Sequence, residues 1–411
     1  MPERGIPSAR RDGQRSFLLR QPDRQPTYAD EARFSRAMRG HRLSRLGLEY
    51  CEDDVICSLA DLRWRTNLLL DRVRYPELGG PARANFDFLT TCAMDGIARL
   101  EAGELFVGLS FGLVRAVYAT AHALARGGEF EPPGSEASPP TPDPEVARAV
   151  AIPRECASEA IPCNTRLEPP SAVFASITSP DVERRWFAHS VAAMFLAWSA
   201  YHEWAHHFAG HLGWLSTVEG VGVAALREFG DVQAVDPDIG QLMEFEADRI
   251  ATWRIASEIL TPPGFVMDAV KTTVPEAQRL RAWLRIAVVM FAALGEQDQA
   301  AVVGRRLLHP HPEVRFWCVY SRARQEVAEK RPELLGEYDA EVRESFRLVR
   351  RMNQACGREQ SGFTLSRADP ELVIAEHDRL NAAVASELHP LTRPYGVVHR
   401  MIAEAGGQSQ N

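Results

Sequence analysis

A histidine–glutamate–histidine motif inside an apolar helical pattern constrains the fold of this chain more than any other feature. The segment HEWAH at 202–206 has the form HExxH, and the pattern of residues 182–211 predicts one long helix around it. Positions i and i+4 share a helix face, so His202 and His206 can reach the same metal ion. Glu203 lies beside the first histidine, and we expect it to accept a proton from zinc-bound water.

A second acidic segment lies on the next predicted helix, which we expect over 239–260. In EFEAD, Glu244 and Asp248 are four residues apart and therefore face the same way. A zinc hydrolase needs a third protein ligand, so we predict that Glu244 binds the metal and that Asp248 accepts the ring N–H of a ligating histidine. Glu246 points elsewhere and is expected to be solvated or paired. An ordinary acidic helix face is the alternative interpretation of this segment.

Two more histidines follow the motif, His207 and His211. On a continuous helix they share a different face from His202 and His206. The segment HHFAGH resembles the longer metzincin signature, but its glycine and histidine are one residue out of that spacing. We therefore favour Glu244 over His211 as the third ligand. Packing, or pairing with an acid, is the alternative role for both histidines.

HEWAH followed by EFEAD resembles the gluzincin zinc metallopeptidases, and most closely the CAAX prenyl endopeptidase and HtpX-like families. The pattern HPxxxxR from His309 to Arg315 fits the same group, and ELFVGLSFGLV at 104–114 is similar to the edge strand that precedes a helix in it. These matches cover roughly 85–125 and 183–325. The membrane helices of the membrane-bound members have no counterpart here, so the chain resembles a soluble and divergent relative.

The resemblance implies one Zn²⁺ per chain, held by His202, His206 and Glu244, with Glu203 as the general base. It implies that His309 approaches the substrate and steadies the developing oxyanion, with Asp248 and Arg315 in supporting positions. An extended peptide substrate could pair with the edge strand through main-chain hydrogen bonds, and the expected substrate-binding residues are Phe106, Val107, Gly108, Leu109 and Ser110.

The pattern of elements predicts a mainly α protein with a small β-sheet, an α+β fold with a zincin-like metallopeptidase core, an HExxH helix, an edge strand and extra helices. Further helices are expected over 275–294 and 312–330. We expect five regions, namely an Arg-rich flexible tail (1–45), helices and the edge strand of the catalytic domain (46–126), a Pro-rich insert (127–182), the helical zinc-binding core (183–330) and a C-terminal helical extension (331–411).

Charge and hydropathy exclude several classes of function. The net charge of −8 argues against a nucleic-acid partner, because phosphate recognition needs a basic surface. The most apolar stretch, 105–125, is interrupted by Arg115 and His122, so no transmembrane segment is expected, and there is no signal-peptide pattern. Seven cysteines without a CxxC pair indicate reduced thiols, and we expect a cytoplasmic protein.

These features together predict a zinc-dependent metalloendopeptidase that acts on a protein or peptide substrate. A catalytically weak zinc-binding sensor or regulatory protein is one alternative, and a zinc hydrolase of a non-peptide substrate is another. The presence of Glu203 favours an enzyme, because a structural zinc site needs no general base and usually prefers cysteine ligands. The sequence leaves the oligomeric state open.

Overall fold

The computed structural model of the chain describes residues 34, 37–38, 62–68, 70–71, 73–89, 94–126, 130, 182–218, 223–227, 236–261, 275–301, 309–355 and 370–401. The fold below is that of these residues. The predicted Arg-rich tail (1–45) and Pro-rich insert (127–182) lie almost wholly outside them.

The sheet has four described strands, β1 (Arg83–Leu89), β2 (Gly96–Glu101), β3 (Glu104–Ser110) and β4 (Val223–Arg227), in the order β1-β3-β2-β4. Strands β2 and β3 form an antiparallel hairpin. Its two turn residues, Ala102 and Gly103, have positive φ angles of 51° and 76°, as expected of a hairpin turn whose twist matches that of its strands. β4 pairs antiparallel with β2, and β1 pairs parallel with β3.

Strand β3 is an interior strand, so the prediction that it forms an edge is wrong. Phe106 lies opposite Asn85 of β1 on one side and opposite Arg99 of β2 on the other. All seven residues of β3 are buried. Its main-chain groups are therefore occupied by neighbouring strands and cannot pair with a substrate, which removes that role from Phe106, Val107, Gly108, Leu109 and Ser110.

Helices make up most of the described chain, which confirms a mainly α protein with a small sheet. The predicted helix over 312–330 is confirmed, whereas the helices expected over 239–260 and 275–294 are longer than predicted. The helices are α4 (Phe111–Arg126), α7 (Val182–Phe208), α8 (His211–Val218), α9 (Pro237–Leu260), α10 (Glu276–Ala301), α11 (Pro312–Lys330), α12 (Leu335–Ala355), α14 (Pro370–Ala383) and α15 (His389–Thr392). Short helical turns are η2 (Pro76–Leu78), η4 (Pro332–Leu334) and the π-helical η5 (Val384–Leu388).

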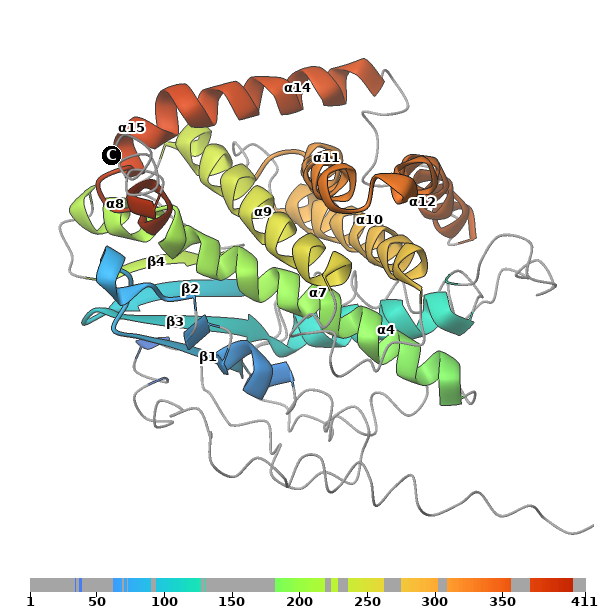
Figure 1. The fold of residues 1–411 in the computed structure, drawn as a ribbon, viewed down its shortest axis with the longest axis horizontal. Helices are drawn as coiled ribbons and strands as arrows, with labels where there is room; N and C mark the ends of the chain where they lie inside the picture. The colour runs from blue at the N-terminus through green and yellow to red at the C-terminus, as the bar shows by residue number, and fades with distance from the viewer. Residues whose placement is uncertain are drawn as a thin grey trace, which may run out of the picture.

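Helix α7 lies between the sheet and α9, with α4 beside it (Figure 1). It is buried because it carries large apolar residues on several faces: the Trp198 ring lies 5.4 Å from that of Phe291 and 6.2 Å from that of Trp283, and Phe195 packs next to it. Burying a side chain such as Phe195 contributes roughly 1.5–3 kcal/mol. The HExxH motif therefore stands on a helix fixed within the main core.

Helix α7 ends at Phe208, so the prediction of one helix running into His211 is wrong. Gly210 has a φ of +94°, a left-handed conformation that glycine adopts readily and that commonly ends a helix. A Cβ at this position would lie 2.5 Å from both Thr392 O and Gly396 N. The chain turns here, and α8 begins at His211 in a new direction.

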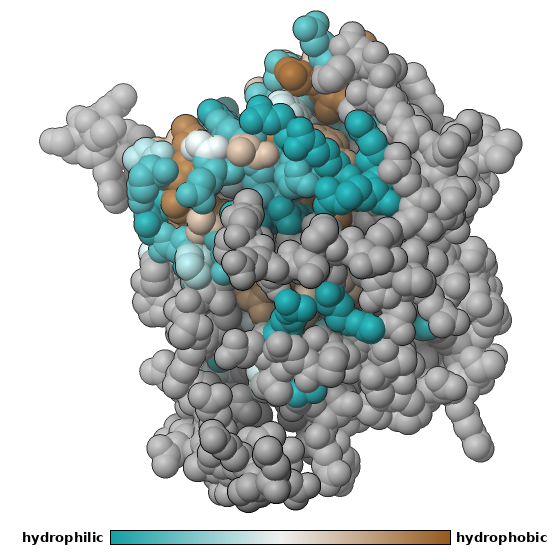
Figure 2. Space-filling view, turned by 90° about the vertical axis from the view of Figure 1, so that its right-hand side faces the viewer, coloured by the Kyte–Doolittle hydropathy of each residue, from teal (hydrophilic) through white to brown (hydrophobic). Residues whose placement is uncertain are grey.

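The described surface is largely hydrophilic on the face drawn in Figure 2, with hydrophobic residues in small groups. The exposed large apolar residues are scattered over separate helices, for example Trp186 on α7 and Leu372 on α14. Scattered apolar side chains are normal on a folded protein. No helix among the described residues is long and apolar enough to cross a membrane. Cys318 is a buried free thiol.

A pair of buried histidines packs where α4 meets α7, with the rings of His122 and His189 4.8 Å apart. Burial, together with the positive charges of His189 and Arg185, lowers the pKa of His122 from 6.5 to about 3. On acidification the unfolded chain therefore takes up a proton at this residue before the folded chain does. The contribution of His122 to folding stability is fully present above pH 6.5 and is lost as the pH falls toward 3.

We expect His122→Phe, which keeps a ring beside Tyr118, to remove this acid sensitivity. His122 should cost the wild type up to about 1.4 kcal/mol of unfolding free energy per pH unit in this window. The measurement is urea unfolding of both proteins at pH 7.5 and pH 5. Equal losses in the two proteins would contradict a neutral, buried His122.

Candidate metal centre

Helices α7 and α9 run in opposite directions and meet in a regular register. Successive turns of α7 face successive turns of α9: Trp198 Nε1 donates to Thr252 Oγ1 at 3.0 Å, and one turn later His202 Nδ1 lies 2.9 Å from Asp248 Oδ1. One turn further, His206 Nε2 lies 3.5 Å from Glu244 Oε1. Four-residue steps on both helices therefore bring HEWAH and EFEAD together.

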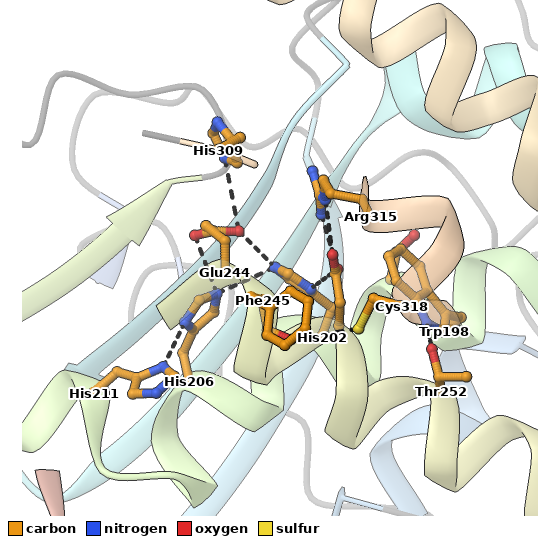
Figure 3. Close-up of polar contacts among 12 residues, drawn as sticks. Trp198, His202, His206, His211, Glu244, Phe245, Thr252, His309, Arg315 and Cys318 are labelled. Carbon is orange, nitrogen blue, oxygen red and sulfur yellow. Dashed lines mark hydrogen bonds and ion pairs between the residues drawn. The ribbon is translucent and has the colours of Figure 1, made fainter. Parts of the chain in front are cut away.

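His202, His206 and Glu244 form a buried group whose ligand atoms all lie within 4.8 Å of one another. Figure 3 shows the two imidazoles converging with the carboxylate. His202 Nε2 lies 3.0 Å from Glu244 Oε2 and 3.2 Å from His206 Nε2. These are the three residues predicted from the sequence, and the group can hold a metal ion.

The position of the ring proton on His202 favours a cation at the point where the two imidazoles and the carboxylate converge. In the neutral form of the His202 ring, Asp248 holds the proton on Nδ1, and Nε2 then directs a lone pair toward the Glu244 carboxylate. Lone pairs that converge in a buried space repel one another unless a cation lies between them. Two imidazoles and one carboxylate are the donor set of several catalytic zinc sites, so these residues fit a metal of that kind.

The pKa values in this group reflect the same arrangement. Burial lowers the pKa of His206 well below its ordinary value, although the charge of Glu244 opposes the shift, so the ring is neutral and can act as a ligand. Burial alone would raise the pKa of Glu244, but electrostatic interactions with the surrounding His206 and His309 imidazoles and a hydrogen bond with His202 hold it well below the usual range. The carboxylate is therefore ionised.

Asp248 is held by Arg315 in a buried ion pair. Arg315 Nε lies 2.8 Å from Oδ2 and Nη2 lies 2.9 Å from Oδ1, while His202 Nδ1 lies 2.9 Å from the same Oδ1. Burial would raise the pKa of Asp248, but the Arg315 guanidinium lowers it. Arg315, in the first turn of α11, thus reaches the site through the carboxylate that orients His202.

His309, which precedes α11 in the chain, also lies near Glu244. Its Nε2 is 3.7 Å from Glu244 Oε2, and the side chain is buried. His311 is the N-cap of α11, and its Nδ1 accepts from the backbone N–H of Glu313. The HPxxxxR spacing therefore places both His309 and Arg315 around the predicted centre.

Glu203 is buried beside the first residue of β2, a contact that the sequence did not predict. A Cβ on Gly96 would lie 2.3 Å from Glu203 Oε1, so the absence of a side chain at Gly96 makes room for the carboxylate. A glycine inside a strand pattern often marks such a close approach, but the sequence does not name its partner.

The two additional histidines have different surroundings. His211, at the start of α8, has Nδ1 3.0 Å from His206 Nδ1 and Nε2 3.1 Å from Glu246 Oε2. It therefore lies behind a predicted ligand rather than on a separate face of the same helix. His207 is buried away from the ligand group, and burial with the nearby charge of Arg400 lowers its pKa to about 4.

No protein-family model, curated protein or solved structure matches this chain.

Proposed function

We propose that this chain is a zinc-dependent metalloendopeptidase that hydrolyses peptide bonds in protein substrates. The observation that carries the proposal is the convergence of His202, His206 and Glu244 in a buried group, with Glu203 next to the first ligand in sequence. An ion pair between Asp248 and Arg315 supports the first ligand from behind. A purely structural metal site would need neither a general base nor this donor set.

Each polar residue then has a distinct task in hydrolysis. A bound zinc ion would supply Lewis acidity, polarising the scissile carbonyl and making a water molecule more acidic. Glu203 accepts a proton from the attacking water and passes it to the leaving amine, so that the amine departs neutral. His309, whose Nε2 lies 3.7 Å from Glu244 Oε2, donates a hydrogen bond to the oxyanion that develops on the carbonyl.

A catalytically weak zinc sensor is the alternative that also uses this ligand set, and a hydrolase of non-peptide substrates is another. They differ from the proposal in what they do to protein. The sensor binds metal and cleaves nothing, whereas the non-peptide hydrolase binds metal and leaves polypeptides intact.

The test is chelator-sensitive cleavage of unfolded casein by the purified full chain. We expect wild type with about one zinc per chain to produce fragments, and a zinc chelator to stop their formation because it removes the ligand-bound ion. His206→Ala should lose stoichiometric zinc on elemental analysis and produce no fragments. Wild-type zinc content in His206→Ala would contradict the ligand assignment.

His207→Ala is the matched control, because it removes a neighbouring buried imidazole that lies outside the ligand group. It should keep both zinc and cleavage. Stoichiometric zinc in the wild type without fragments from casein or a proteome extract would select the sensor or the non-peptide hydrolase over the peptidase.

A further inference from the structure

A chain of polar contacts runs from the metal centre to the C-terminal helices. It starts at His206 Nδ1, the ring nitrogen on the far side from Glu244, which lies 3.0 Å from His211 Nδ1 (Figure 3). His211 Nε2 lies 3.1 Å from one oxygen of Glu246, and His389 Nε2 lies 2.8 Å from the other oxygen. Four separate elements, α7, α8, α9 and α15, thus contribute to one line of contacts.

The proton positions along this line are determined once His206 binds a metal through Nε2. Its Nδ1 must then carry the proton and donate to His211 Nδ1, which accepts. His211 therefore carries its own proton on Nε2 and donates to Glu246 Oε2. The second oxygen of Glu246 accepts from His389 Nε2. Each donor meets an acceptor, so the line is consistent with the metal-binding tautomer of His206.

The residues in the middle of this line are also buried. His211 is fully buried and Glu246 is 6% exposed. Each oxygen of the Glu246 carboxylate has one histidine ring nitrogen as its hydrogen-bond partner. A buried carboxylate without these donors would be costly, and it therefore holds both histidines in place.

The C-terminal segment is anchored against the same part of the molecule. Ala209 and Gly210, just after the motif helix, pack against the backbone of Gly396, and Gly210 also faces Thr392 at the end of α15. This close backbone contact between Gly210, Thr392 and Gly396 fixes α15 next to α8. This explains how His389, 143 positions away from Glu246 in sequence, reaches that carboxylate.

We propose that His211, Glu246 and His389 are positioning residues that hold the His206 ring in its metal-binding tautomer and orientation. Metal affinity thereby depends on the C-terminal helices. This inference rests on the proposed metal centre. It assigns a role to His211, which follows HEWAH, to Glu246, which lies inside EFEAD, and to His389, which is far from both in sequence.

The experiment measures zinc affinity of the full chain by competition with a chromophoric chelator. We expect His211→Leu to weaken zinc binding by roughly 10- to 100-fold and His389→Leu by about tenfold, as for other residues that orient metal ligands. His389→Gln, whose amide nitrogen can replace Nε2 as donor, should restore most of the affinity. In the cobalt-substituted protein, His211→Leu should also shift the visible absorption bands, since the His206 ring is no longer held.

A double-mutant cycle tests whether the line acts as a unit. His211→Asn keeps an acceptor for His206 Nδ1 but cannot reach Glu246. Once this substitution has interrupted the line, His389→Leu should cause little additional loss of zinc affinity. Full additivity of the two losses would overturn a connected line.

His377→Leu is the matched control. His377 belongs to the same C-terminal helices and contacts Ser321 and the Phe245 ring, but not the line to His206. It should leave zinc affinity unchanged. Equal losses in His377→Leu and His389→Leu, or wild-type affinity in His389→Leu, would overturn the inference. Absence of zinc binding by the wild type would instead overturn the metal centre itself.

Discussion

Glu203→Gln is expected to lower kcat for casein hydrolysis by roughly 10²- to 10⁴-fold, the usual contribution of a positioned general base. Glutamine keeps the shape of the side chain but cannot accept the proton of the attacking water. The ligands are untouched, so the variant should retain about one zinc per chain. Steady-state kinetics and elemental analysis on the same preparation measure the two quantities together.

Gly96→Ala is the companion to this variant. The new methyl group would lie 2.3 Å from Glu203 Oε1 and must displace the carboxylate, which is the flexible end of its side chain. We expect zinc to remain and kcat to fall, with the base intact but misplaced. Hydrolysis at the wild-type rate by Glu203→Gln would remove Glu203 from the mechanism.

The second large effect is expected from Arg315→Met. Asp248 is fully buried and accepts hydrogen bonds from both Nε and Nη2 of Arg315. The variant therefore leaves a buried carboxylate with only His202 as a partner. Breaking a buried pair in this way costs about 3–5 kcal/mol. Zinc affinity should also fall, because Asp248 orients His202. Urea unfolding and chelator competition measure the two losses.

Arg324→Met is the matched control for this prediction. Arg324 makes a similar two-point contact with Asp339, at 2.7 and 2.8 Å, but the two side chains are 42% and 35% exposed. Solvent screens such a pair, so we expect a loss below about 1 kcal/mol and unchanged zinc affinity. Arg315→Lys, which keeps the charge but not the fork, should fall between the two. An Arg315→Met protein as stable as Arg324→Met would contradict the prediction.

The pairs of candidate ligand and supporting residues on each helix could be predicted from the sequence because each pair depends only on local geometry. His202 and His206 share a face on any α-helix, as do Glu244 and Asp248, wherever the two helices lie. The same reasoning extends to the ends of α11, where Pro312 stands at the first helical position. Periodicity fixes such features without any knowledge of tertiary contacts.

Other parts of the site depend on tertiary contacts that no local pattern contains. The sequence pattern for β3 was correct as a strand, but its interior place depends on β1, which was not recognised as a strand. His211 was assigned to the wrong face because the helix was extended past Gly210, although a glycine at that point is a common helix-ending signal. The meeting of Glu246 with His389 depends on how distant helices dock.

The left-handed turn at Gly210 also limits how the length of the chain can vary next to the motif. Only Ala209 and Gly210 separate the end of α7 from His211. Adding or deleting one residue there would displace His211 by up to about 3.8 Å, more than the 3.0 Å that separates it from His206. The spacing between His206 and His211 should therefore tolerate no insertion, even if loops elsewhere in the protein tolerate changes in length.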